Sequence, residues 1–159
     1  VCSSDLILGL DNYKILESNS NLFHGYETGI GRIATLDAPI SLNELCERVK
    51  EKLNIDKLRY VGDLNSVVNT VAVVNGSGND LLNRAKDMGA DCIITGDTTY
   101  HYASDFKEEG ISIIDAGHFG TEWIGMKVVG EWLQNRIKTM GFDTKVYISE
   151  ETICPYEYK

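Results

Sequence analysis

The stretch "ISIIDAGHFGTEW", residues 111–123, contains the transition that decides the fold. Its first five residues form a short apolar run with β-branched side chains, which is typical of a strand buried on both faces. Gly117 then relaxes the backbone, and the residues from Thr121 onward have the spacing of an amphipathic helix. The stretch therefore predicts a buried strand over 111–115, a tight turn, and a long helix over 121–137.

Strands and helices are expected to alternate along the rest of the chain. Strands are predicted at 32–36, 58–62, 67–75, 91–95 and 144–149, and helices at 41–53, 80–89 and 98–110. The helix over 41–53 has the clearest start, because Ser41 stands three residues before Glu44 in a capping box. Alternating elements with short apolar strands predict an α/β fold, a layered sheet of mixed or mainly parallel strands flanked by helices.

Composition narrows the class of protein. The chain has 159 residues, enough for one domain with a real core, and it lacks the apolar run of about 20 residues that a membrane span requires. We therefore expect no membrane partner, and because a formal charge of −9 repels phosphate backbones, we expect no direct nucleic-acid binding either. The four cysteines, Cys2, Cys46, Cys92 and Cys154, are widely spaced without a C-x-x-C pair, which indicates reduced thiols in a cytoplasmic protein.

Three loops are candidates for a functional site. In open α/β sheets, ligands bind beyond the carboxyl ends of the strands, where loops converge with helix amino termini. The segments "NGSGND" (75–80), "TGDTTYH" (95–101) and "DAGHFGTE" (115–122) all follow predicted strands in this way.

His118 and Glu122 stand four residues apart at the start of a predicted helix. Their Cβ atoms are then about 5–6 Å apart on one face, and a cation with bonds of about 2 Å fits between the side chains. In the alternative interpretation, His118 caps the helix and Glu122 is a solvated first-turn acid that the helix dipole favours. Two ligands do not complete a site, because a catalytic zinc needs three protein ligands and a water.

Asp97 and His101 repeat the four-residue spacing after the preceding strand, and Asp115 ends the strand before His118. If adjacent strands carry these loops, Asp97, His101, His118 and Glu122 face one cleft. The alternatives are that Asp97 is the N-cap of the following helix and that His101 is an ordinary helix-face histidine.

The Gly76-Ser77-Gly78 loop offers backbone N–H groups to a phosphate, but it lacks the full spacing of dinucleotide and P-loop fingerprints. Asp80 also places a negative charge beside it, so a tight turn is the favoured interpretation. There is no Gly-x-Ser-x-Gly elbow to support nucleophilic catalysis.

Taken in order, the segments "GIGRIATL", "SLNELCERVKEKL", "LRYVGD", "VAVVNGSG", "GADCIITGDTTYH" and "IDAGHFGTE" resemble the carboxyl-terminal half of a family of dinuclear metal proteins. This family is known as GTP cyclohydrolase I type 2 homologues, or NGG-interacting-factor-three-like proteins. The resemblance runs from about Leu6 to the carboxyl terminus.

The resemblance implies a two-metal site in a cleft between two similar α/β lobes, in subunits that form a toroidal homohexamer. His118 and Glu122 fall on the family's carboxyl-terminal metal ligands, and the metals expected are two divalent ions of zinc, iron or manganese. Asp97, His101 and Asp115 are expected to support the ligands or to bind substrate.

The family's other ligands, a His-His pair and a His…Asp element, belong to its amino-terminal lobe and are not in this sequence. We therefore expect residues 1–28 to be a remnant of a truncated upstream lobe and residues 29–159 to be the carboxyl-terminal α/β metal-binding lobe. The opening hexapeptide "VCSSDL" resembles a translated adapter sequence, so residues 1–5 are expected to be non-native and support no functional inference.

Two functions follow as hypotheses. The first is a metal-dependent hydrolase, like a GTP cyclohydrolase, acting on an unidentified small-molecule substrate but inactive as this fragment. The second is a metal-stabilised oligomeric binding or regulatory module without catalysis.

Overall fold

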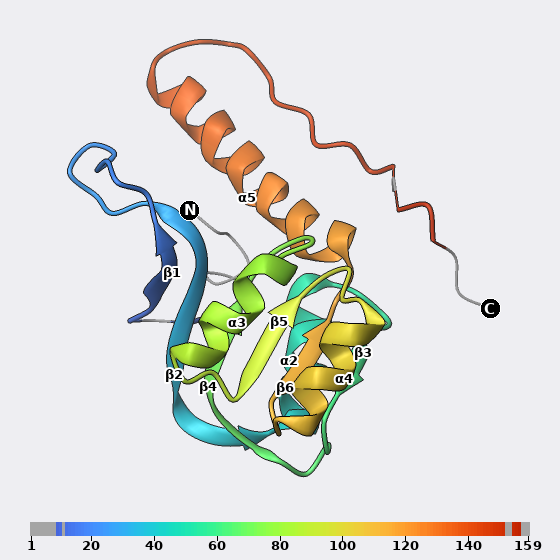
Figure 1. The fold of residues 1–159 in the computed structure, drawn as a ribbon. Helices are drawn as coiled ribbons and strands as arrows, with labels where there is room; N and C mark the ends of the chain where they lie inside the picture. Colours follow the sequence, from blue (N-terminus) through green and yellow to red (C-terminus); the bar gives the residue numbers. More distant parts are fainter. Residues whose placement is uncertain (1–8, 11, 152–153, 157–159) are drawn as a thin grey trace.

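Three short apolar strands form the centre of the sheet (Figure 1). A computed structural model describes residues 9–10, 12–151 and 154–156. Strands β4 (Val67–Val73), β5 (Cys92–Thr95) and β6 (Ser112–Asp115) are parallel. Three further strands join them in antiparallel pairings: β1 (Lys14–Ser18), β2 (Gly29–Ser41) and β3 (Arg59–Val61). The order β1-β2-β4-β5-β6-β3 confirms the expected α/β fold with a mixed sheet.

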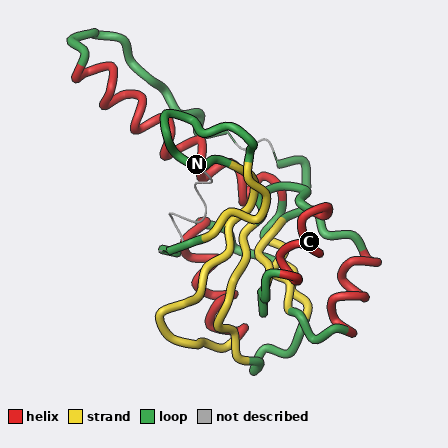
Figure 2. The backbone as a smooth tube through the Cα atoms, turned by 60° about the vertical axis from the view of Figure 1, so that its left-hand side comes forward, coloured by secondary structure: helices red, strands yellow, loops and turns green. Residues whose placement is uncertain are grey.

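Helices cover both faces of this sheet, as Figure 2 shows. Side chains alternate along each strand, so Val71 and Val73 of β4 face one apolar cluster while Ala72 faces the other. Helix α2 (Leu42–Leu53) packs on the first face, and α3 (Asn79–Asp87) and α4 (Tyr100–Glu108) pack on the second. Burial on both faces explains why the central strands are almost wholly apolar.

Helix α2 begins and ends with specific caps. The Ser41 hydroxyl accepts a hydrogen bond from the Glu44 N–H at 3.1 Å, which is half of the predicted capping box. The Glu44 carboxylate instead pairs with Arg48 one turn later, at 3.4 Å. At the other end Asn54 takes the left-handed conformation, with φ of 54°, and its N–H donates to the carbonyls of the last turn.

Helix α5 (His118–Thr139) starts at the carboxyl end of β6 and extends away from the sheet (Figure 1). Only Thr121 and Gly125 of its 22 residues are buried. Large apolar side chains are exposed along it, namely Met126, Val128, Val129, Trp132 and Leu133. Among the described residues, no helix is both long and apolar enough to span a membrane.

The strand predicted over 144–149 is wrong. This segment has the alternation of a strand, but within the described residues it pairs with no strand and lies against α5. The side chain of Gln134 replaces a ladder: it accepts from the Val146 N–H at 2.7 Å and donates to the Thr144 carbonyl at 3.3 Å. Ile148 lies against Gly130, so the alternating apolar residues pack on a helix.

Strand β1 was not expected from the sequence. Its central residue Leu16 is 2% exposed and belongs to the same apolar cluster as α3, and the strand pairs with β2 from Lys14 to Ser18. The sheet thus includes part of the range 1–28, although its origin in an upstream lobe stays a prediction. Residues 1–5 lie outside the described residues.

The described core contains two buried thiols, Cys46 and Cys92, and neither forms a disulfide. Burial raises the pKa of both thiols, which keeps them protonated. Cys2 lies outside the described residues.

The Ser41 cap predicts a measurable loss of stability. Ser41→Ala removes the acceptor for the Glu44 N–H, and we expect the free energy of unfolding to fall by about 1 kcal/mol. Urea denaturation measures the change, and Ser20→Ala, at an exposed position outside the helix, is the control. Equal unfolding midpoints for the two variants would show that the cap contributes nothing.

Candidate metal-binding site at the start of α5

The loops after β5 and β6 lie against one another at the carboxyl edge of the sheet. Thr95 and Asp115, the last residues of the two parallel strands, are paired in register. A side chain at Gly96 would place its Cβ only 2.7 Å from the backbone nitrogen of His118, so glycine is required where the two loops meet. This close approach brings Asp97 alongside the first turn of α5.

His118 lies between two carboxylates. Its Nδ1 is 2.8 Å from Oδ2 of Asp97, and its Nε2 is 3.3 Å from Oε1 of Glu122. All three side chains are about half exposed, so the group is open to solvent. The expected pairing of His118 and Glu122 on one face of a helix is therefore present, and Asp97 joins it from the neighbouring loop.

The capping alternatives are wrong for His118 and Asp97. Gly117 is the N-cap of α5 and His118 is the first helical residue. Thr99 is the N-cap of α4, while Asp97 lies two residues earlier with φ of 53°. Aspartate tolerates this left-handed conformation better than most residues, and the backbone there directs its carboxylate to His118 rather than to its own helix.

The Gly76 loop completes the walls of the site. The Gly76 N–H donates to Oγ1 of buried Thr121 at 3.0 Å, which ties the β4–α3 loop to the first turn of α5. With φ of 60°, Gly76 approaches so closely that an added Cβ would be 2.5 Å from Oε1 of Glu122 and 3.1 Å from Nε2 of His118. The sequence predicted a turn in this loop but did not predict its contact with the site. No sequence motif pointed to Thr121.

Asp115 has a different environment from the other acids. It is 5% exposed, pairs with Arg59, and accepts hydrogen bonds from the N–H groups of Thr98 and Gly117 at 3.0 Å each. Its carboxylate thus joins the residue after Asp97 to the residue before His118. Asp115 therefore holds the two loops together from a buried position, whereas Asp97, His118 and Glu122 are open to solvent.

His101 does not join this group. It is exposed on α4, and its ring packs edge-on against that of Tyr100. Within the described residues it has no hydrogen bond or ion pair with Asp97, His118 or Glu122. A role for His101 in substrate binding stays a prediction.

The donor atoms have the spacing of a partial metal site. Two donors bound to one tetrahedral zinc at about 2.0–2.1 Å lie roughly 3.3 Å apart, and the Nε2–Oε1 distance is 3.3 Å. A carboxylate on the other ring nitrogen is the usual way to fix the tautomer and orientation of a metal-bound histidine. However, no group of three His, Cys, Asp or Glu side chains in the described part of the chain is arranged to hold an ion, so these residues fit two positions of a shell and not all of it.

The two carboxylates also change the protonation of the imidazole. The hydrogen bond that the imidazole donates to the Asp97 carboxylate raises the pKa of His118, and the negative charge of Glu122 acts in the same direction. The folded protein therefore binds this proton more tightly than the unfolded chain. The resulting stabilisation is fully present below the unfolded pKa of about 6.5 and is lost as pH rises through the folded value.

The chain matches one known protein family over almost its whole length. The family described as Duf34/NIF3 (NGG1p interacting factor 3) matches residues 5–155. A GTP cyclohydrolase 1 type 2 homolog of Clostridium acetobutylicum is 46% identical over 153 residues, which are 96% of this chain and 56% of that protein. A protein of the same name from Bacillus subtilis is 35% identical over 136 residues, or 83% of this chain and 35% of its own length.

Solved structures with the same fold include a protein related to NIF3. A Bacillus cereus protein related to NIF3 superposes with a TM-score of 0.78 at 32% identity, covering 85% of this chain and 37% of that one. A Staphylococcus aureus hypothetical protein has a TM-score of 0.84 at 24% identity, covering 98% and 62% respectively, which shows a shared fold. The chain spans about a third to just over half of the length of the curated relatives described above.

Replacing Asp97 tests the arrangement around His118. Asp97→Asn removes the charged hydrogen-bond partner, and we expect the pKa of His118 to fall toward its ordinary value. Proton NMR titration of the three histidine rings in chelator-treated protein measures the shift.

Asp105→Asn, at an exposed position of α4, is the matched control and should leave His118 unchanged. The same His118 titration curve in both variants would contradict the contact with Asp97.

Proposed function

The chain belongs to the Duf34/NIF3 family, and on that premise we propose that His118 and Glu122 together bind a divalent metal ion at the start of α5. The observation that carries the proposal is the 3.3 Å separation of Nε2 and Oε1, two donor atoms that lie beside each other beyond the end of a strand. Asp97 supports it, because its contact with Nδ1 leaves Nε2 as the ring nitrogen on the side of Glu122.

The remaining ligands are proposed to come from a second lobe that this chain does not contain. The chain spans just over half of its Clostridium acetobutylicum relative, and its half-exposed donors leave room for further ligands. With imidazole and carboxylate donors, zinc, iron and manganese are all suitable, and two such ions are expected in the complete site. Asp115 and Arg59 would keep the loops in place without touching the ions.

The activity we propose is hydrolysis by the complete two-lobed protein. A divalent ion supplies Lewis-acid chemistry, which favours attack of water on a polarised carbonyl, amidine or phosphoryl group. In this chain, Glu122 and His118 would hold the ion, Asp97 would fix the imidazole through Nδ1, and the Gly76 loop lies against one side of the site. The name of the curated relatives makes GTP the first substrate to test.

Removing the imidazole is the most direct test of this function. His118→Ala in the protein that carries both lobes is expected to lose at least one metal ion per subunit and to lose hydrolysis with it. Elemental analysis measures the metal, and release of product from GTP measures the activity.

His24→Ala is the control, because this histidine lies in the exposed loop between β1 and β2, outside the site. Full metal content in His118→Ala would overturn the metal assignment. Loss of metal with unchanged hydrolysis would overturn the catalytic assignment alone.

A second function is supported by a separate observation. Beyond Gly125, α5 exposes Met126, Val129, Trp132 and Leu133, and an apolar helix face of this kind is usually covered by another protein surface. We propose that copies of this chain associate through it, in keeping with the homohexamer that the resemblance implies. A metal-stabilised oligomeric module without catalysis would need this surface and would not need an open metal coordination position.

A charge placed on this face should weaken the association. Trp132→Glu introduces a carboxylate that would be buried on assembly, so we expect a shift toward the 17.7 kDa monomer. Sedimentation velocity across a concentration series measures the shift. Asn135→Glu adds the same charge at an exposed polar position of α5, and equal assembly of the two variants would rule out this face.

A further inference from the structure

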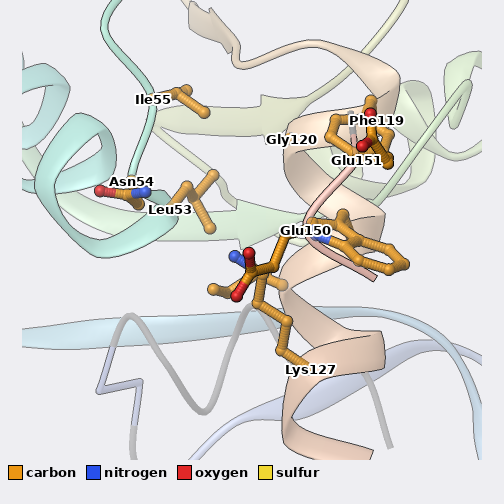
Figure 3. Close-up of a pocket in the computed structure, with 10 residues that line it drawn as sticks. Leu53, Asn54, Ile55, Phe119, Gly120, Lys127, Glu150 and Glu151 are labelled. Atoms are coloured by element: carbon orange, nitrogen blue, oxygen red, sulfur yellow. The ribbon is translucent and has the colours of Figure 1, made fainter. Parts of the chain in front are cut away.

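A pocket of about 260 Å³ lies beside the first two turns of α5 (Figure 3). One wall comes from the end of α2 and the residues after it, including Leu53 and Ile55. The opposite wall comes from Glu150 and Glu151, in the segment that runs back along α5. The pocket therefore joins three parts of the chain that are far apart in sequence.

An aromatic pair forms the apolar part of this pocket. The rings of Phe119 and Trp123 stack one helical turn apart, with centroids 5.7 Å apart and an angle of 15° between their planes. Both side chains are only partly buried and both line the pocket. A flat, partly exposed aromatic surface next to aliphatic side chains suits a planar ring better than a flexible chain.

The polar part of the pocket is mainly acidic. Glu150 and Glu151 line it, and within the described residues neither carboxylate has a hydrogen bond or an ion pair. A carboxylate accepts two parallel N–H bonds from donors on adjacent atoms, and this pairing adds geometric selectivity to its strength. Lys127, one turn beyond Trp123, is the cation among the lining residues and is available to an anionic substituent.

We propose that this pocket binds a planar nitrogen heterocycle that presents two adjacent N–H donors. Its ring would lie against Phe119 and Trp123, and its donor edge would face the carboxylates of Glu150 and Glu151. A guanine-like or pterin-like ring has both features. A guanidinium group has the donor edge but a much smaller flat surface, so it would gain little from the aromatic pair.

The pocket and the proposed metal ligands share the same two helical turns. Phe119 follows His118 in the chain and Trp123 follows Glu122, so each pocket residue is rotated by about 100° around the helix from a metal-ligand candidate. The inference rests on the proposed function only where it assigns this ring to the substrate. Binding of the ring itself requires no metal.

Tryptophan fluorescence tests the proposal. The chain has two tryptophans, Trp123 and Trp132, so in a Trp132→Phe background the emission comes from Trp123 in the pocket. Guanosine, titrated in the presence of a chelator, is expected to quench this emission saturably. Inosine, which lacks the exocyclic amino group, should bind about tenfold more weakly because one charge-assisted hydrogen bond is lost.

The carboxylates are tested by substitution in the same background. Glu150→Gln combined with Glu151→Gln should weaken guanosine binding about tenfold and reduce the preference over inosine, while the aromatic contact remains. Glu131→Gln, at an exposed position of α5 outside the pocket, is the matched control and should bind guanosine normally. Circular dichroism checks that each variant is folded.

Four results would overturn the proposal. These are the absence of saturable quenching by guanosine, equal affinities for guanosine and inosine, equal competition by free arginine, and unchanged binding after both glutamates are replaced. His118→Ala separates this proposal from the metal assignment, since guanosine binding should persist in that variant. If His118→Ala loses metal and still binds guanosine, the result supports both the metal site and the heterocycle pocket. If His118→Ala keeps its full metal content and still binds guanosine, the result contradicts the metal site alone.

Discussion

The close approach of the Gly76 loop to the first turn of α5 is the constraint on which the candidate site depends. The Gly76 N–H donates to buried Thr121 at 3.0 Å, while its carbonyl accepts from the Gly96 N–H at 2.9 Å. Gly76 thus connects the loop after β4 to the loop after β5 and to the first turn of α5. A side chain at Gly76 would meet the carboxylate of Glu122 and the ring of His118, and the φ of 60° at this residue also favours glycine.

Electrostatics explain why a cation suits this place. Asp97 and Glu122 both lie beside His118, and among the described residues neither is paired with a lysine or arginine. Asp115, the third acid nearby, is neutralised by Arg59 and by two backbone N–H groups. The carboxylates of Asp97 and Glu122 raise the pKa of His118 and give the site a negative potential, which a divalent ion would offset more than a single proton does.

The central architecture was predictable because the apolar strands and the cap of α2 are local signals. Cys92–Thr95 and Ser112–Asp115 are strands as expected, and Ser41 precedes α2 as expected. The prediction of a strand over 144–149 failed because an alternating pattern describes the two faces of a segment but not whether a neighbouring strand is available to pair with it. Leu16 was missed for the converse reason: β1 is short and mostly polar, and it exists because β2 offers it an edge.

The site was only partly predictable for a similar reason. The spacing of His118 and Glu122 is fixed within one helix, so sequence alone placed them together. Asp97 and His101 share that spacing, yet α4 begins at Tyr100, so Asp97 reaches His118 and His101 is exposed on the helix. The contact of Gly76 with Glu122 depends on loops from two strands, which no local pattern describes.

The central claim is that Nε2 of His118 and a carboxylate oxygen of Glu122 bind the same ion. Anomalous diffraction at the zinc edge, from crystals of the two-lobed protein grown with zinc, locates that ion directly. The account predicts a peak about 2.0–2.2 Å from both atoms, with Nδ1 still bonded to Asp97. A zinc ion bound through Nδ1, or ions placed away from these two side chains, would contradict it.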